Sequence, residues 1–595
     1  AVNYLLKAMV GSSLSTIVIF LPFMLMSGVA GSYFKVMTDT MIITLVSSFF
    51  VTWLLLPVIY LLLSKDKKEV KKVEHHDVKE RKWVGFFIRK PIFSYVFMGL
   101  LVLVTALIIP NISTGFLPDM DEGSIILDYN SPPGTSLQET DRELREVEKI
   151  IKANPQVEAY SRRTGTQMGF FITEPNRGDY LINLKKDRTQ TTAEVTDDIR
   201  AKIEKTGLPL TVDFGQVITD MLGDLMSSAQ PIEIKVFGTD FNKIQDYSQQ
   251  ISKIVEKVPG TADVFDGILI AGPSIEISPN FSILAQYQIS PQNFQYQTQT
   301  ILSGNTVGDL FDENQFTPIR ILYNNKSNAS VQEIQNAMIS LPNGQLKPLK
   351  EFAKVSILKG SAEVEREDLQ NIGVVSARLD NGDLGGTIKN IQSEINSKIK
   401  LPTGYSIVYG GAYAEQQKSF SELLLILIVS SLLVFTTILF LFRNLKVAFL
   451  ILLVSILGIS GSFILLFITG TPLNVGSYTG LIMMVGIIGE NAIFTYLQFE
   501  ESLEEKSKEN ALIYAISTRL RPKLMTALGA IIALMPLALG IGTGAQMHQP
   551  LAIAVIGGFL VALPLLLIVL PTLLNKLYFK EKIKKKEIPI SHKLS

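Results

Sequence analysis

Eight apolar runs along the chain have the length and composition of membrane-spanning helices. A helix needs about 20 apolar residues to cross the hydrocarbon layer of a bilayer. The predicted spans cover residues 10–29, 41–63, 94–109, 421–442, 447–468, 476–499, 524–540 and 551–574. The third and fourth spans are separated by about three hundred residues that are too charged to lie inside a membrane.

The loops between the spans alternate in charge. Basic sequences follow the second, fourth, sixth and eighth spans, at 64–82, 443–446, 519–523 and in the tail after 576. The loops at 469–477 and 540–550 contain no Lys or Arg. Because short cytoplasmic loops are enriched in Lys and Arg, this pattern predicts that the large polar region lies on the extracytoplasmic side.

The two ends of the chain contain similar apolar segments. "FLPFMLMSG" around Pro22 resembles "LMPLALGIG" around Pro536, and "WLLLPVIYLLL" around Pro57 resembles "IVLPTLLNKLY" around Pro571. The two prolines of each pair are separated by the same distance (57 − 22 and 571 − 536, both 35). The first two spans are therefore predicted to repeat the last two. Such duplication is typical of transporters whose substrate or ion site lies between the repeats.

The polar region shows alternating strand and helix patterns. The strand "GSIILDYN", a helix at 137–153, the strands "VEAYSRR" and "DYLINLK", a helix after Thr191, and the strand "LTVDFG" follow one another. This β-α-β-β-α-β order is typical of the ferredoxin-like fold. A second copy begins at "PIEIKVFG", continues through a helix at 242–258, "ADVFDG" and "SIEISP", and ends with "VVSARLD", a helix at 387–399 and "YSIVYGG". An insertion at about 281–362 interrupts this copy.

Composition excludes several functional classes. The 595 residues have a formal net charge of +0, which gives no general electrostatic reason to bind nucleic acid. The chain contains no Cys and only four His, so a disulfide framework, a thiolate metal site and a histidine cage are not expected. No P-loop, G-x-S-x-G or H-E-x-x-H motif occurs. We therefore expect no catalytic residue and no cofactor, and an ion gradient as the energy source. Because the chain begins with Ala1 and no signal peptide precedes the first span, it is expected to be part of a longer protein.

Glu490 lies well inside the predicted span "GLIMMVGIIGENAIFTYLQF". A charged residue at the centre of a membrane helix costs roughly 2.5–3.5 kcal/mol on translocon scales. Glu490 is either a protonated or paired residue that holds helices together, or a group that takes up and releases a proton. Asn491 follows it, and Arg519, Lys523 and Thr526 lie near the start of the next span. Arg519 and Lys523 could equally be positive-inside anchors, and Thr526 could bond within its own helix.

Several of these sequences together resemble the resistance-nodulation-division (RND) efflux transporters. They are "GLIMMVGIIGENAI", "RLRPKLMTALGAIIALMPLALGIGTGA", "PLAIAVIGG" and "FLPDMDEG". The resemblance runs from the fifth membrane helix of that family to its C-terminus. It implies a proton-driven homotrimeric permease in the bacterial inner membrane, working with a periplasmic adaptor protein and an outer-membrane channel.

The resemblance also implies a fold class and a domain layout. The fold class is a polytopic α-helical membrane protein with α+β, ferredoxin-like periplasmic porter subdomains and an inserted docking subdomain. In the implied layout, residues 1–110 form three transmembrane helices with a basic cytoplasmic loop at about 64–91, and residues 418–575 form five more, followed by a basic cytoplasmic tail at 576–595. Between them lie a first porter subdomain (111–230) and a second, split porter subdomain (231–280 and 363–417). The docking subdomain (281–362) is inserted in the second porter subdomain.

Two sets of site residues follow from the resemblance. Glu490 occupies the position where drug exporters usually carry the relay lysine, and silver- and copper-exporting members have glutamate there with a lysine that matches Lys523. The implied proton relay consists of Glu490, Asn491, Lys523, Thr526 and Arg519. The sequence "TGTQMGFFITEP" resembles the switch loop of drug exporters, which implies that Met168, Gly169, Phe170 and Phe171 bind substrate.

The substrate class stays open between two alternatives. Silver- and copper-exporting members carry three periplasmic methionines, and the matching positions here are Leu117 and, more loosely, Arg177 and Asp224. Met168, Met221 and Met226 lie close in sequence, although methionine more often fills gaps in a core. No metal-binding residue is therefore assigned, and amphipathic organic compounds are the first expectation. Metal cations are the alternative, and an inactive membrane-anchored periplasmic scaffold is the alternative from another class.

Overall fold

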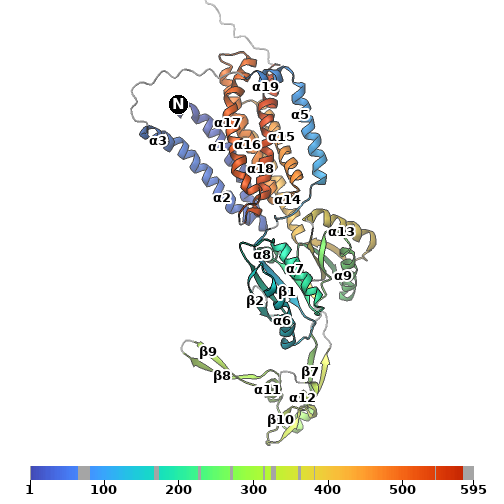
Figure 1. The fold of residues 1–595 in the computed structure, drawn as a ribbon. Helices are drawn as coiled ribbons and strands as arrows, with labels where there is room; N and C mark the ends of the chain where they lie inside the picture. The colour runs from blue at the N-terminus through green and yellow to red at the C-terminus, as the bar shows by residue number, and fades with distance from the viewer. Residues whose placement is uncertain are drawn as a thin grey trace, which may run out of the picture.

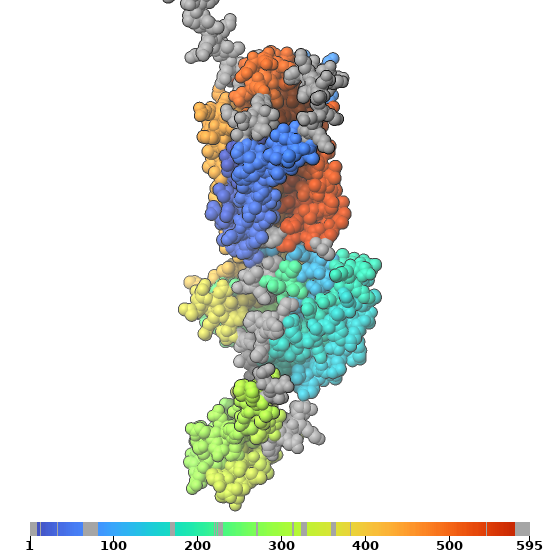
Figure 2. All heavy atoms as spheres, turned by 90° about the vertical axis from the view of Figure 1, so that its left-hand side faces the viewer, coloured from blue at the N-terminus to red at the C-terminus, as the bar shows by residue number. Residues whose placement is uncertain are grey.

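A computed structural model of the chain describes residues 2–63, 81–118, 120–166, 173–225, 230–268, 272–312, 315–322, 330–358, 364–380, 382–542 and 544–579. Three tiers follow one another along the long axis of the molecule (Figure 1). A bundle of long helices forms one end, two α/β units form the middle, and a small inserted unit forms the other end. The space-filling view shows the same three tiers (Figure 2).

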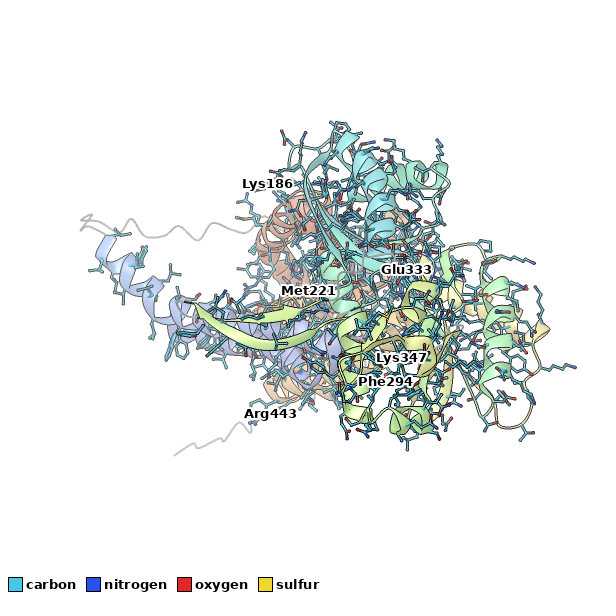
Figure 3. The ribbon with its side chains drawn as sticks, turned by 90° about the horizontal axis from the view of Figure 1, so that it is seen from below. Lys186, Met221, Phe294, Glu333, Lys347 and Arg443 are labelled. Atoms are coloured by element: carbon cyan, nitrogen blue, oxygen red, sulfur yellow. The ribbon has the colours of Figure 1, made fainter. Side chains whose placement is uncertain are left out.

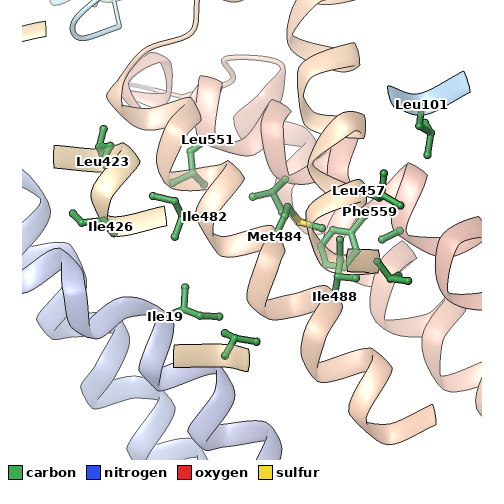
Figure 4. Close-up of a cluster of buried hydrophobic side chains, with 14 of the residues drawn as sticks. Ile19, Leu101, Leu423, Ile426, Leu457, Ile482, Met484, Ile488, Leu551 and Phe559 are labelled. Carbon is green, nitrogen blue, oxygen red and sulfur yellow. The ribbon is translucent and has the colours of Figure 1, made fainter. Parts of the chain in front are cut away.

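Seven helical segments in the described part of the chain are long and apolar enough to cross a membrane, and a shorter apolar segment covers Met9–Leu25. The helices of the bundle are α1 (Val2–Phe20), α2 (Gly28–Phe50), α3 (Leu56–Leu63), α5 (Ile92–Ile108), α14 (Ala412–Phe442), α15 (Leu445–Thr469), α16 (Val475–Ser502), α17 (Lys508–Ala538), α18 (Gln549–Pro564) and α19 (Leu570–Phe579). Helices α15, α16 and α18 lie at the centre and bury most of their apolar length. Figure 4 shows part of their common core, where Met484 and Ile488 of α16 lie beside Phe559 of α18.

The predicted limits of the first two spans are wrong. The first ends in a short 3₁₀ turn, Leu21–Leu25, which contains Pro22, and α2 begins at Gly28 rather than at Met41. The chain reverses here because Ser27 is extended and Gly28 has φ +69°. Glu422 of α14 fixes this elbow by accepting hydrogen bonds from the Ser27 backbone N–H (3.1 Å) and Oγ (2.6 Å).

Two further boundaries differ from the prediction. The segment predicted to be the basic loop at 64–91 contains a helix, α4 (Lys82–Arg89). Helix α17 begins at Lys508, sixteen residues before the predicted start of its span at 524, so that Arg519 and Lys523 are helical rather than part of a loop. The start of α17 was misplaced because only the apolar length of the helix was counted, whereas a helix can continue past the hydrocarbon layer.

The two ends of the chain repeat a local distortion as well as a sequence. A five-residue π-helical segment covers Val51–Leu55, and a second covers Leu565–Val569, at the same 514-residue offset that separates Pro57 from Pro571. Proline lacks the N–H that would bond the preceding turn, and its ring crowds that turn. A widened π turn just before each proline is a common way to accommodate such a break.

The first α/β unit is built from β1 (Ser124–Asn130), α6 (Leu137–Ala153), β2 (Val157–Thr164), β3 (Arg177–Leu184), α7 (Thr192–Lys205) and β4 (Thr211–Gly215). Its antiparallel sheet has the strand order β2-β3-β1-β4. Helix α6 begins at Ser136, whose side chain accepts from the Glu139 N–H, and α7 begins at a complete capping box of Thr191 and Glu194. Both helices bury their apolar sides against the sheet, and α8 (Val217–Leu225) follows β4.

The second α/β unit has the same connectivity. It contains β5 (Ile232–Gly238), α9 (Phe241–Val255), β6 (Thr261–Phe265), β14 (Gln370–Leu379), α13 (Leu384–Lys398) and β15 (Ser406–Gly410), with β14 between β5 and β6 and with β13 (Glu365–Glu367) also paired to β14. Strand β15 leads directly into α14, so the sheet is joined to the membrane bundle without a long linker.

The strand "SIEISP" was predicted in this second sheet, and that placement is wrong. As β7 (Ser274–Pro279) it pairs along its whole length with β12 (Ala353–Leu358) and forms a two-stranded stalk. The stalk carries the inserted unit, which has its own core and contains α10 (Phe281–Gln286), α11 (Pro291–Leu302), α12 (Val331–Gln335), β10 (Met338–Ser340) and β11 (Leu346–Pro348). A ribbon of β8 (Asn305–Asp312) and β9 (Gln315–Ile321) extends away from this unit (Figures 1 and 3). Alternation defines the two faces of a strand but not its partner, which explains the error.

Candidate functional site

Glu490 lies near the middle of α16 and is half-buried between helices. Its Oε2 accepts a hydrogen bond of 2.9 Å from Thr16 Oγ1 of α1. Helix α1 approaches α16 closely because Gly486 lies one turn before Glu490, where an added Cβ would be only 1.6 Å from Ile19 Cδ1. Thr16 and Ile19 also line a cavity of about 290 Å³ between α1, α2 and α16. This cavity places open space beside the hydroxyl that holds the carboxylate.

Asn491, Lys523 and Thr526 meet on another side of α16. They line a second, much smaller cavity of about 10 Å³, between α16, α17 and α18. Asn491 Nδ2 donates to the Ile487 carbonyl (2.8 Å), and Thr526 Oγ1 donates to the Pro522 carbonyl (3.0 Å). The hydrogen bond of Thr526 to its own helix agrees with the simpler of its two interpretations.

Lys523 is the least satisfied member of this group. It is 5% exposed, and within the described part of the chain its Nζ has no hydrogen-bond partner. A buried ammonium group without an acceptor is costly, because its lost hydration is not replaced. The adjoining cavity of about 10 Å³ is close to the volume that one water molecule needs, so it has room for no more than one small acceptor.

Arg519 lies one turn before Lys523 and points to different partners. Its Nη2 donates to Gln498 Oε1 (3.3 Å), and its guanidinium lies 5.6 Å from the centre of the Phe494 ring. The five predicted relay residues thus occupy neighbouring helices but form at least two separate contacts, and their common role stays a prediction.

The predicted substrate loop cannot be placed. Met168, Gly169, Phe170 and Phe171 all lie outside the described residues. Of the three methionines near the metal-exporter positions, only Met221 has a described side chain; it is on α8 and 57% exposed (Figure 3).

The first α/β unit contains a row of carboxylates that was not identified from the sequence. In the sheet, Asp128 of β1 is directly opposite Asp179 of β3 on one side and Asp213 of β4 on the other. Asp220, on α8, adds a fourth nearby negative charge that acts on Asp128. We call Asp128, Asp179, Asp213 and Asp220 the acid row. Like charges directly opposite one another destabilise a sheet, so this arrangement has a cost in the folded protein.

Two aspartates of the acid row have raised pKa values. Burial raises the pKa of Asp128 to about 7, with further increases from Asp220, Asp179 and Asp213, while Arg163 lowers it. Burial also raises the pKa of Asp213, whose side chain accepts a hydrogen bond from Gln230. Asp179 differs because Arg163 forms a two-bond ion pair with it (2.6 and 2.7 Å).

The acid row is not a ready-made metal cage. In the described ranges no group of three or more His, Cys, Asp or Glu side chains is close enough to hold one ion. A sequence signal for the row did exist, since each of "SIILDYN", "GDYLINL" and "TVDFG" contains one Asp in a strand that is otherwise largely apolar. Only the register of the three strands brings these aspartates together.

The chain matches one family model and is similar to proteins that are named for metal resistance. The AcrB/AcrD/AcrF family model matches residues 1–577. The chain is 26% identical to the cobalt-zinc-cadmium resistance protein CzcA of Cupriavidus metallidurans, over 97% of this chain and 56% of that protein. It is 25% identical to the nickel and cobalt resistance protein CnrA of the same organism, over 93% of this chain and 53% of that protein.

A solved structure shares the fold. The crystal structure of a heavy metal efflux pump superposes with a TM-score of 0.82 at 22% identity and covers 97% of this chain and 58% of that one. The chain thus spans somewhat more than half the length of the proteins that it matches.

Proposed function

The chain belongs to the AcrB/AcrD/AcrF family, the RND permeases, and from this premise we propose that it is the permease of a proton-driven pump that exports divalent metal cations. The acid row is the observation that carries the choice of substrate. The matched relatives support it, since two of them are named for resistance to cobalt, zinc, cadmium or nickel. This reverses the order of the two substrate classes expected from the sequence, where organic compounds came first.

The chemistry of the acid row favours some cations over others. Carboxylate oxygens bind Zn²⁺ and similar divalent ions, whereas Cu⁺ and Ag⁺ prefer thioether and thiolate sulfur. Met221 is exposed on α8. The positions that match the three periplasmic methionines of silver- and copper-exporting members are occupied here by Leu117, Arg177 and Asp224. We therefore expect cobalt, nickel, zinc or cadmium rather than copper or silver.

The row also suits a site that must bind and then release its ion. A divalent cation would relieve the repulsion between Asp128 and its neighbours, which gives binding energy without a rigid cage. Because the pKa of Asp128 is about 7, protons compete with the cation in the ordinary pH range of the cell exterior. A conformational change that moved the carboxylates of the acid row apart would favour protons over the cation, and the cation would be released.

Proton movement through the helical bundle would supply the energy for transport. Glu490, Asn491, Lys523, Thr526 and Arg519 form the proposed proton relay, with Glu490 as the group that changes protonation. The hydrogen bond from Thr16 supports this role, because it places a carboxylate beside a cavity in the bundle.

The remaining parts of the proposal follow family organisation. The two α/β units are proposed to be the porter subdomains, the inserted unit the docking subdomain, and the protein a homotrimer in the inner membrane. An adaptor and an outer-membrane channel would complete the pump. The large polar region would face the periplasm, as the positions of the basic loops indicate.

Deletion and complementation of the complete native gene test the proposed function. Growth inhibition is measured with cobalt, nickel, zinc, cadmium, copper, silver, bile salts, dyes and hydrophobic antibiotics. We expect the deletion strain to be sensitive to one or more of the first four metals only. The wild-type gene should restore resistance, and Asp128→Asn should not. Asp187→Asn is the matched control, because it removes an exposed aspartate from the same unit.

Each other outcome has a clear meaning. Sensitivity to organic compounds alone contradicts the metal assignment and restores the first expectation from the sequence. Full resistance with Asp128→Asn removes the acid row from the transport path. Unchanged resistance of the deletion strain to every compound would favour the inactive scaffold.

A further inference from the structure

Helix α4 packs against α17, α19 and the π-helical segment that precedes α19. Val84, Gly85 and Ile88 are buried against the ends of α17 and α19. The fit is close, since a Cβ added to Gly85 would be 3.3 Å from Ile513 Cδ1 of α17. The backbone N–H of Arg81, just before the helix, donates to Ser517 Oγ of α17 (3.0 Å).

The opposite side of α4 and the first turn of α5 together combine aromatic rings with cations. Trp83, Phe86 and Phe93 are exposed large apolar side chains. The Phe86 and Phe93 rings are 5.6 Å apart, and Lys90 Nζ lies 5.2 Å from the centre of the Phe86 ring. We define the α4 surface as the exposed residues Arg81, Lys82, Trp83, Phe86, Lys90 and Phe93.

Within the described residues, three cations of the α4 surface form no ion pair. Arg89, the other exposed cation of the helix, forms an ion pair with Glu509 (2.7 Å). In the described parts of the chain, no carboxylate forms an ion pair with Arg81, Lys82 or Lys90. Lys576, in the last turn of α19, adds a nearby cation whose Nζ lies 4.9 Å from the Tyr95 ring.

The position of the α4 surface relative to the lipid-facing side of α5 identifies its environment. Just beyond Lys90, α5 begins with the exposed apolar residues Ile92, Phe93 and Val96, and this exposed apolar stripe continues along the helix. The α4 surface therefore lies at the level where the hydrocarbon layer ends, on the side that the basic loops assign to the cytoplasm. Aromatic rings are favoured at this depth, and cations there attract anionic headgroups.

We infer that the α4 surface binds the headgroups of anionic phospholipids in the cytoplasmic leaflet. The charge complementarity between three cations that form no ion pair within the described residues and a phosphate-rich, negatively charged layer supports this occupant over a neutral lipid. The rings of Trp83, Phe86 and Phe93 would set the depth of the helix, while Arg81, Lys82 and Lys90 would select the lipid. This inference does not depend on which substrate the proposed pump transports.

Fluorescence quenching can test the inference, because the chain has two tryptophans, Trp53 and Trp83. The complete protein is reconstituted in lipid nanodiscs with Trp53 and any tryptophan outside these 595 residues replaced by Phe, so that Trp83 is the reporter. Nanodiscs contain equal fractions of phosphatidylcholine and phosphatidylglycerol, and one or the other lipid is brominated to quench nearby tryptophan. We expect at least about fivefold enrichment of phosphatidylglycerol next to Trp83, the preference expected for a single cation at a charged surface.

Two comparisons separate the α4 surface from general charge effects. Arg81→Gln/Lys82→Gln/Lys90→Gln should abolish the enrichment. Arg443→Gln/Lys446→Gln removes one cation at the end of α14 and one at the start of α15 instead, and should leave the enrichment unchanged. The preference should also fall in 0.5 M NaCl, because salt screens exposed charges.

Three results would overturn the inference. Equal quenching by the two brominated lipids means that the surface does not select anionic headgroups. Quenching by neither means that Trp83 is not at the membrane interface. Enrichment that survives the triple substitution means that other groups attract the lipid.

Discussion

At the scale of single residues, Glu490 and Lys523 have different surroundings although both belong to the proposed relay. Glu490 is held by Thr16 of α1, whereas Lys523 faces the small cavity beside Asn491. The carboxylate thus has a hydrogen-bond donor, and the ammonium has no acceptor among the residues that the structure describes. A proton change at Glu490 would therefore alter the α1–α16 contact first.

Glu490→Gln should abolish proton-driven metal transport without affecting assembly. Glutamine keeps the size and can still accept from Thr16, but it cannot change protonation. Transport is measured as metal uptake by inside-out vesicles after a pH gradient is imposed, with the complete protein. Glu500→Gln, at the exposed end of the same helix, is the control and should transport normally. Undiminished uptake by Glu490→Gln would remove Glu490 from the relay.

Asp128 should make the folded protein less stable as the pH rises. Its pKa is about 7 in the folded protein and 3.8 as a free aspartate, so the folded state binds the proton more tightly. Its contribution to stability is complete below pH 3.8 and is lost as the pH rises through about 7. Asp128→Asn cannot ionise and should lose less melting temperature between pH 5 and pH 8 than the wild type. If the melting temperatures of the two proteins changed by the same amount between pH 5 and pH 8, this result would contradict the raised pKa of Asp128.

At the scale of elements, the centre of the bundle depends on two glycines. Helices α15 and α18 cross where Gly461 and Gly557 meet. A Cβ added to Gly461 would be 2.2 Å from the Gly557 carbonyl oxygen, and one added to Gly557 would be 2.4 Å from the Gly461 carbonyl oxygen. Such small residues allow membrane helices to approach closely and gain packing energy.

Gly557→Val should separate α15 from α18 and prevent stable folding of the bundle. Since backbone atoms cannot move aside as a flexible side chain can, we expect a marked loss of monodisperse protein on size-exclusion chromatography in detergent. Gly529→Val on α17 is the matched control, because nothing lies within 4 Å of the Cβ that it adds. An equal yield for both variants would show that the close crossing is not required.

At the scale of the whole molecule, an ion-pair cluster joins the two α/β units. Arg200 of α7 in the first unit binds Asp263 of β6 in the second unit (2.6 Å), and Arg378 of β14 binds the other oxygen of Asp263 (3.0 Å). These side chains are only 15–29% exposed, so water screens the charges less than at an open surface. The relative position of the two units is therefore fixed partly by charge.

A double-mutant cycle on Arg200→Ala and Asp263→Ala should give a coupling energy of about 1 kcal/mol or more, as expected for partly buried contacting groups. Thermal unfolding of the four proteins measures it. The exposed pair Glu394–Lys398 on α13 is the reference, and its cycle should give no more than about 0.5 kcal/mol. Equal coupling in the two cycles would mean that the cluster does not hold the units together.

Most helices and strands of this protein, and much of their order, could be predicted from local patterns in the sequence. In the described part of the chain, apolar runs indicated the seven helical segments that are long and apolar enough to cross a membrane and the shorter apolar segment Met9–Leu25, although the limits of the first two were misplaced. Alternating patterns located the strands of both α/β units, because such patterns depend on residues a few positions apart. The matching prolines even indicated the repeat that the two π-helical segments share. Glu490 was found because a carboxylate in an apolar run is unusual wherever it points.

Which elements are neighbours became known only from the three-dimensional fold. Strand register aligned Asp179, Asp128 and Asp213, each of which looks ordinary in its own strand. Chain folding brought Thr16 to Glu490 across 474 positions and paired β7 with β12 instead of the second sheet. Periodicity records which face of an element is buried, whereas a site depends on distances between elements, and no local pattern in the sequence contains those distances.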